Sequence, residues 1–153
     1  MDCLTALGKQ ISKILEKGET LLDCYDILAG YCGKDWSKYE CFCCEKYSRN
    51  PIYKDDNVEI LLLCWDVDQF TPIHDHPDKG CLVKVIKGSL IEENYIKCND
   101  NYVLKDLHRI NVGDISYQEG KYGIHRIKND GGTKACTLHI YAPPNYKFKK
   151  LKE

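Results

Sequence analysis

Residues 58–96, VEILLLCWDVDQFTPIHDHPDKGCLVKVIKGSLIEENYI, decide the fold of this chain. They hold short runs that are apolar or that alternate between apolar and polar residues, and clusters of Asp, Gly and Pro separate these runs. Runs of this kind are typical of β-strands joined by turns. They predict strands at Val58 to Trp65, Thr71 to His76, Leu82 to Ile86 and Leu90 to Ile96.

The same texture continues towards the C-terminus, without a helical pattern in between. It predicts further strands at Tyr102 to Ile110, Ile115 to Tyr117, His125 to Lys128 and Ala135 to Tyr141. Short strands in succession with no intervening helices favour an antiparallel sandwich or a jelly-roll barrel. We therefore expect a mostly β protein.

Before residue 50 the apolar residues fall at helical spacing. Leu4, Leu7 and Ile11 would share one face of an amphipathic helix, with Gly18 as its stop. A second helix is expected to end at Gly30. A third is indicated by Trp36, Tyr39, Phe42 and Cys43.

This pattern predicts a single domain over residues 1–153. A helical segment is expected over residues 1–46 and a β-barrel over residues 50–146. The last residues, 147–153, are mostly charged and are expected to form a solvated tail.

The composition excludes several classes of partner. The 22 basic and 23 acidic residues nearly cancel, so nothing favours nucleic acid or a membrane surface, and a small neutral or zwitterionic ligand fits better. The first residues lack a secretory pattern, and the apolar run at 60–65 is too short to span a membrane. The ten cysteines follow no disulfide framework. We expect a cytoplasmic monomer with reduced thiols.

Two histidines are the first sign of chemistry. His74 and His76 lie two residues apart on a predicted strand, so both side chains would point to one face, and Ile73 and Asp75 to the other. Such a pair is half a metal site, although chance pairs on exposed strands are common. With the distant His125 it would suit zinc, manganese or iron equally.

At these residues the sequence resembles the cupin superfamily, whose first motif has His-x-His followed by an acidic residue and whose second supplies a third histidine. Here Cys81 takes the acidic position, and Asp68 stands where the motif has glycine. That cysteine, with Gly-Ile-His-Arg-Ile-Lys-Asn at 123–129, makes the chain similar to the cysteine dioxygenases. The segments YSRN at 47–50 and LHIYAPP at 138–144 match the same family in order and spacing.

The resemblance implies a cupin jelly-roll barrel with a short N-terminal helical segment. It also implies an oxidoreductase of cysteine metabolism that binds one Fe(II) per chain on His74, His76 and His125. Its substrates would be L-cysteine and O2, and its product cysteine sulfinic acid. Arg49, with Tyr47 beside it, would bind the substrate carboxylate, since guanidinium can do so bidentately. A surface ion pair is the alternative for Arg49.

Thr137, His139 and Tyr141 alternate along one strand, so all three can face the barrel interior. In the family this line of hydroxyl, imidazole and phenol ends with the tyrosine near the metal, and serine is usual where Thr137 stands. Similar proteins join the residues equivalent to Cys81 and Tyr141 by a thioether, which we expect here. A cis bond is likewise implied before Pro143.

Other interpretations remain open from sequence. A related dioxygenase could act on 3-mercaptopropionate, and a cupin could bind a metal without catalysis. Cys41, Cys43 and Cys44 could suggest a zinc knuckle, but no second pair of cysteines has matching spacing. His108 is expected to be a surface histidine. The chain ends soon after Pro144, so the pocket beyond that residue is expected to close differently from that of animal relatives.

Overall fold

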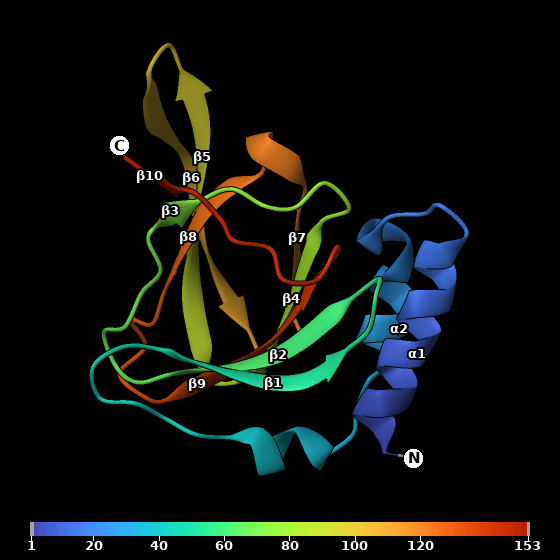
Figure 1. The fold of residues 1–153 in the computed structure, drawn as a ribbon. Helices are drawn as coiled ribbons and strands as arrows, with labels where there is room; N and C mark the ends of the chain where they lie inside the picture. Colours follow the sequence, from blue (N-terminus) through green and yellow to red (C-terminus); the bar gives the residue numbers. More distant parts are fainter. Residues whose placement is uncertain (1, 153) are drawn as a thin grey trace.

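The computed structural model describes residues 2–152 and contains two five-stranded antiparallel sheets that pack face to face (Figure 1). In the first sheet the strands follow the order β1 (Ser48–Lys54), β2 (Glu59–Trp65), β9 (Ala135–Tyr141), β4 (Cys81–Lys87) and β7 (Ile115–Gln118). In the second the order is β10 (Lys150–Leu151), β3 (Ile73–His74), β8 (Ile124–Lys128), β5 (Ser89–Cys98) and β6 (Asn101–Asn111). The predicted mostly β architecture is confirmed.

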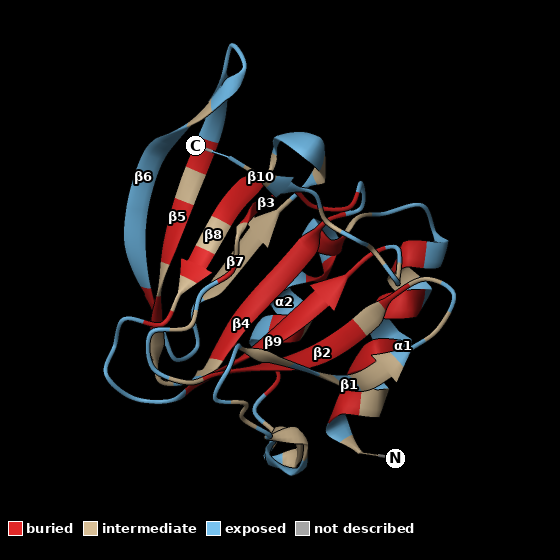
Figure 2. Cartoon of the chain, turned by 60° about the vertical axis from the view of Figure 1, so that its left-hand side comes forward, coloured by how far each residue is buried: buried red, intermediate tan, exposed pale blue. Residues whose placement is uncertain are grey.

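The central strands β2 and β9 of the first sheet are buried on both faces, which explains the unbroken apolar run of β2. Leu61, Leu63 and Trp65 point between the sheets, where Leu90 and Ile127 of the second sheet meet them. The residues that alternate with them in β2 point the other way, into a cluster shared with the N-terminal helices. Figure 2 shows β2, β4 and β9 buried and β6 exposed along the far edge.

The helices cover the outer face of the first sheet. They are α1 (Cys3–Glu16), the 3₁₀ turn η1 (Leu21–Cys24), α2 (Tyr25–Ala29) and the 3₁₀ turn η2 (Asp35–Tyr39), and a further 3₁₀ turn, η3 (Gly120–Tyr122), precedes β8. Asp2 caps α1 by accepting a hydrogen bond from the Thr5 amide at 2.7 Å. Within residues 2–152, no helix has the length and apolar character needed to cross a membrane.

The third helix is shorter than predicted. It ends at Tyr39, and residues 40–47 form a loop that lies along the sheet. Backbone groups of this loop form hydrogen bonds with side chains from distant parts of the chain. The Cys41 amide donates to Cys64 Sγ at 3.5 Å, and Gln69 Nε2 donates to the Cys43 carbonyl at 2.6 Å. Because these backbone groups already have hydrogen-bond partners outside the segment, forming a helix would add little stability there.

Two strands were not predicted. β1 contains Pro51, which argues against a central strand, and it lies at the edge of its sheet with an irregular register between Pro51 and Tyr53. The lysines of the predicted solvated tail at 147–153 are exposed where the structure describes them, but the segment is not a free tail, because β10 pairs with β3 and Leu151 packs near Ile73. Residue 153 lies outside the described part of the chain.

Candidate metal centre

Three buried histidines meet in the second sheet. His74 on β3 and His125 on β8 are directly paired across the two strands. His76 lies in the loop after β3, where its amide donates to the Gly120 carbonyl at 3.2 Å. The predicted pair of imidazoles on one face and the distant third histidine are therefore brought together. Their possible ligand atoms all lie within 4.8 Å of one another.

The outer nitrogen of each ring is held by an oxygen. His74 Nδ1 lies 2.8 Å from the Pro72 carbonyl, His76 Nδ1 bonds the Gly123 carbonyl, and His125 Nδ1 lies 2.7 Å from Glu92 Oε2. Since carbonyl and carboxylate oxygens only accept, we assign a proton to each Nδ1. The three Nε2 atoms then carry unprotonated lone pairs.

These lone pairs point at one another. His125 Nε2 lies 3.0 Å from His76 Nε2 and 3.2 Å from His74 Nε2, with no proton between them. Burial, with the neighbouring His125, holds the pKa of His76 well below its usual value and that of His74 at about 3, so neither ring gains a second proton near neutral pH. Three converging lone pairs in a buried site fit a divalent metal ion.

Glu92 on β5 orients the third histidine from behind. Its side chain is 2% exposed, and Oε2 also accepts from Ser116 Oγ. Burial would raise the pKa of this carboxyl, but the hydrogen bonds from His125 and Ser116 keep it below its usual range. The other oxygen lies 3.1 Å from Nε2 of His108, which is half-exposed and reaches inward from β6. Sequence reasoning missed Glu92.

Arg49 lies beside the histidines. It is exposed on the edge strand β1, paired with Leu63, and its Cζ is 5.6 Å from the centre of the Tyr141 ring. Within residues 2–152, no carboxylate lies within ion-pair distance of its guanidinium. Tyr47 is stacked on Trp65 at 4.7 Å between ring centres. Within the described residues, Arg49 therefore makes no surface ion pair.

An open cavity of about 440 Å³ reaches this arginine. Tyr47, Arg49, Pro72 and Phe148 line it, together with Lys46 and Lys150. The side chain of Phe148 lies against His74, with 4.5 Å between ring centres. The cavity therefore has a cationic rim, and Phe148 separates it from His74. Such a rim suits a small anionic or zwitterionic ligand.

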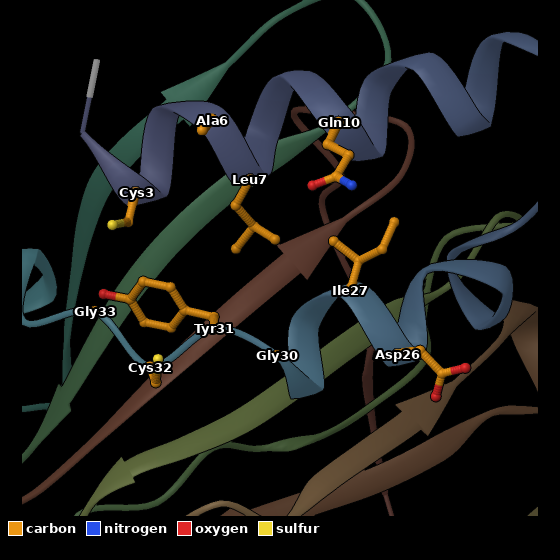
Figure 3. A pocket seen from close by; sticks show the side chains of 10 residues that line it. All are labelled: Cys3, Ala6, Leu7, Gln10, Asp26, Ile27, Gly30, Tyr31, Cys32 and Gly33. Carbon is orange, nitrogen blue, oxygen red and sulfur yellow. The ribbon is translucent and has the colours of Figure 1, made fainter.

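A second hollow, between α1 and α2, is unrelated to this chemistry. Figure 3 shows Leu7 and Ile27 pointing into it, with Cys3 and Tyr31 at one end. None of the three histidines lines this hollow or the cavity at Arg49, but the cavity at Arg49 includes Phe148, which packs on His74. On chemical grounds the cavity at Arg49 is the candidate site.

Comparison with known proteins identifies the family. The model of the family described as cysteine dioxygenase type I matches residues 4–153. The chain belongs to this family. Cysteine dioxygenase type 1 of Rattus norvegicus and that of Homo sapiens are each 29% identical to it over 115 residues, which is 72% of this chain. The chain spans 58% of the length of these curated relatives.

Solved structures agree on the fold. A protein with a double-stranded β-helix domain from Klebsiella pneumoniae is similar with a TM-score of 0.63 and 18% identity, over 76% of this chain and 88% of that one. An RmlC-like cupin from Desulfovibrio desulfuricans gives a TM-score of 0.50 and 17% identity, over 74% and 97%. The predicted cupin barrel with a short N-terminal helical segment is confirmed.

In this member of the cysteine dioxygenase type I family, the predicted polar line on β9 lies inside the barrel. Thr137 Oγ1 accepts from Trp65 Nε1 at 3.0 Å and lies 3.0 Å from His139 Nδ1. The Thr137 hydroxyl proton can then go to His139 Nδ1, so we assign the ring's own proton to Nε2. The His139 and Tyr141 rings follow one another at 5.8 Å between centres.

Cys81 and Tyr141 are directly paired across β4 and β9. Both are buried, at 1% and 6% exposure, and both belong to the cluster between the sheets. Directly opposite residues of an antiparallel pair have their Cβ atoms about 4.5–5.5 Å apart. The register therefore puts the two side chains next to one another.

Other sequence expectations have structural outcomes. The Ala142–Pro143 bond is cis, and Asp68 adopts a φ of 68°, a left-handed conformation that glycine adopts without strain. Within residues 2–152, the three histidines are the one group of three or more His, Cys, Asp or Glu ligand atoms that converges. Cys41, Cys43 and Cys44 are thus not gathered into a zinc knuckle.

Glu92→Gln is expected to lower the affinity for metal by about 10- to 100-fold, because an amide is a weaker acceptor for His125 Nδ1–H than a carboxylate. Competition with a chelator measures this affinity. Glu93→Gln is the matched control: Glu93 is the next residue of β5, and it binds Arg126 on the opposite face. Equal affinities for the two variants would contradict the role given to Glu92.

Proposed function

We propose that this chain is an iron-dependent dioxygenase that converts L-cysteine and O2 to cysteine sulfinic acid. The supporting observation is that three imidazoles converge beside a cavity lined by an arginine with no carboxylate partner in the described chain. Phe148 connects the two, because it lines this cavity and packs on His74. The family supports the reaction class. We further propose that the protein acts in the cytoplasm as a monomer, in keeping with its nearly balanced charge and its cysteines without a disulfide framework.

His74, His76 and His125 would hold the iron through their Nε2 atoms. When bound, Fe(II) would supply the redox chemistry and favour the thiolate form of the substrate. Arg49 would take the substrate carboxylate bidentately, with Tyr47 packed beside it. This orients the substrate so that its sulfur points towards the histidines.

Tyr141 would serve as a hydrogen-bond donor. Burial, reinforced by Cys81, raises the pKa of its phenol well above the usual value, so the proton stays on oxygen near neutral pH. Arg49 stands over its ring. His139 stays neutral because burial, followed by the charge of Arg49, lowers its pKa. The phenol can therefore donate to an oxygen atom that develops negative charge during the reaction.

The test is oxygen uptake by purified chain loaded anaerobically with Fe(II), with sulfinate measured by mass spectrometry. We expect uptake that needs both iron and cysteine, with cysteine sulfinic acid as the product. Absence of uptake in chain that carries one iron would favour a metal-binding cupin without catalysis. A clear preference for 3-mercaptopropionate over cysteine would contradict the substrate.

A thioether between Cys81 Sγ and a ring carbon of Tyr141 is expected to form during turnover. The bond replaces one S–H and one C–H, so the chain loses two hydrogen atoms while O2 is reduced. Intact mass and a faster band in denaturing, reducing electrophoresis report it. Cys81→Ala should lack both signals, and Cys136→Ala, which removes a buried thiol of the same sheet outside the cavity, should keep them. Unchanged mass after many turnovers would refute the bond.

A further inference from the structure

The segment 145–151, named here the C-terminal strap, forms one wall of the cavity through Phe148 and Lys150. Its first residue, Asn145, donates its amide to Glu59 Oε1 at 3.0 Å. Its last two form β10, in which Lys150 pairs with His74 and Leu151 with Ile73. Figure 1 shows this segment running beside β3. The strap is thus in register with the strand that carries the first histidine of the site.

Asp75 fixes the middle of the strap. This residue stands between His74 and His76, is 8% exposed, and points away from the metal-binding face. Its Oδ1 accepts from the Tyr146 hydroxyl at 2.7 Å and from the Lys149 amide at 3.0 Å. Breaking these hydrogen bonds would leave a buried carboxylate without donors, which costs free energy. The Tyr146 hydroxyl and the Lys149 amide are therefore held in place.

Phe148 lies between these two anchors. Its ring is half-buried and packs on His74, with 4.5 Å between ring centres and 42° between planes. Tyr146 and Lys149 are bonded to Asp75 on either side of it along the chain. The ring therefore has little freedom to move away from the histidine.

Phe148 also separates two hollows. Beyond the cavity of about 440 Å³ lies a second of about 460 Å³, which Glu59 and Tyr146 help to line. The residues common to both are Tyr47, Arg49, Phe148 and Lys150. Phe148 is the one apolar side chain among these four that also touches a histidine of the metal site. Truncating it would join the hollows next to Arg49.

We propose that Phe148 sets the upper size limit of the thiol admitted between Arg49 and the three histidines. This inference rests on the proposed function only in taking a carboxylate-bearing thiol as the ligand. The Phe148 ring lines the cavity with Arg49 and packs on His74, so a thiol with its carboxylate on Arg49 and its sulfur towards the histidines would lie beside this ring. A group added to the amine, or an added methylene, would then contact it. Bulk at either position is rejected by contact with a ring that the strap holds in place.

The test measures thiol binding without turnover. Chain loaded with Co(II) is titrated anaerobically with cysteine, homocysteine and N-acetylcysteine, and the thiolate-to-cobalt absorption gives each Kd. Wild type should bind cysteine most tightly. In Phe148→Ala the preference for cysteine over the two larger thiols should fall by about tenfold or more, since one misplaced methylene or small group costs that much.

Matched variants separate a size limit from damage to the fold. Phe70→Ala makes the same truncation at a side chain that is 57% exposed and outside both hollows, and should keep the wild-type preference. Phe148→Leu, which keeps apolar packing, should give an intermediate preference. Tyr146→Phe removes one anchor and should weaken the preference in the same direction.

The outcomes distinguish this inference from the function. An unchanged preference in Phe148→Ala, with one cobalt bound and cysteine oxygenated by the iron form, overturns the size limit alone. A changed preference in a chain that oxygenates no thiol supports the size limit and overturns the dioxygenase. Absence of a thiolate band in wild type overturns both.

Discussion

His125→Ala is expected to abolish metal binding at stoichiometric concentration and to reduce oxygen uptake by more than about 1,000-fold. His125 Nε2 is the nitrogen closest to both other ligands, at 3.0 Å from His76 and 3.2 Å from His74, so its loss removes the centre of the cluster. The change also leaves the buried Glu92 carboxylate without one of its donors. Metal content by elemental analysis and oxygen uptake check the result.

His108→Ala is the control for this variant. His108 lies on β6, is half-exposed, and contacts the Glu92 oxygen that does not hold His125. We expect it to keep one metal ion per chain. A His125→Ala chain that still bound one ion and consumed oxygen at the wild-type rate would refute the assignment of the metal ligands.

Arg49→Lys is expected to lower kcat/KM for cysteine by about 100-fold, since lysine cannot make the bidentate contact with the carboxylate. Lysine keeps the positive charge, but its ammonium group lacks the planar arrangement of N–H donors with which guanidinium binds both oxygens of a carboxylate. Because the arginine is proposed to orient the sulfur as well, both KM and kcat should worsen. Steady-state oxygen uptake as a function of cysteine concentration measures both constants.

Arg109→Lys makes the same change at an exposed pair with Asp130, 3.1 Å apart, and is expected to leave kcat/KM unchanged. A second check uses cysteamine, which is cysteine without the carboxylate. If Arg49 binds that carboxylate, Arg49→Lys should affect cysteamine turnover far less than cysteine turnover. Equal losses for both thiols would contradict carboxylate binding and indicate a structural role for Arg49.

The sequence predicted those parts of the fold and site that depend on short spacing. The two-residue interval between His74 and His76 places both imidazoles on one side of an extended chain, whatever the strand pairs with. In the same way, the alternate positions of Thr137, His139 and Tyr141 place these three side chains on one face of β9. Cys81 and Arg49 were recognised by resemblance to a family, because spacing alone does not bring either to the histidines.

The role of Glu92 could not be predicted from spacing. This residue is followed by Glu93, and the two faces of β5 carry similar apolar residues, Leu90 on one and Tyr95 on the other. Alternation therefore could not tell which glutamate points inward. Only the pairing of β5 with β8, which sets Asn94 opposite His125, turns Glu92 towards the ring of His125.

The C-terminal strap is the clearest case of a decision made by tertiary structure. In the sequence, Phe148 and Leu151 are isolated apolar residues in a charged run, and local pattern predicts a solvated tail. In the fold, β3 offers an unpaired edge and Asp75 offers a buried acceptor, so the segment gains partners that exist only once the barrel has closed. By itself, the sequence determined the β-rich fold class and which residues share a face of a strand, since both follow from local periodicity. The assembly of the three histidines, and the packing of Phe148 on His74, depend on contacts between distant segments, which periodicity does not encode.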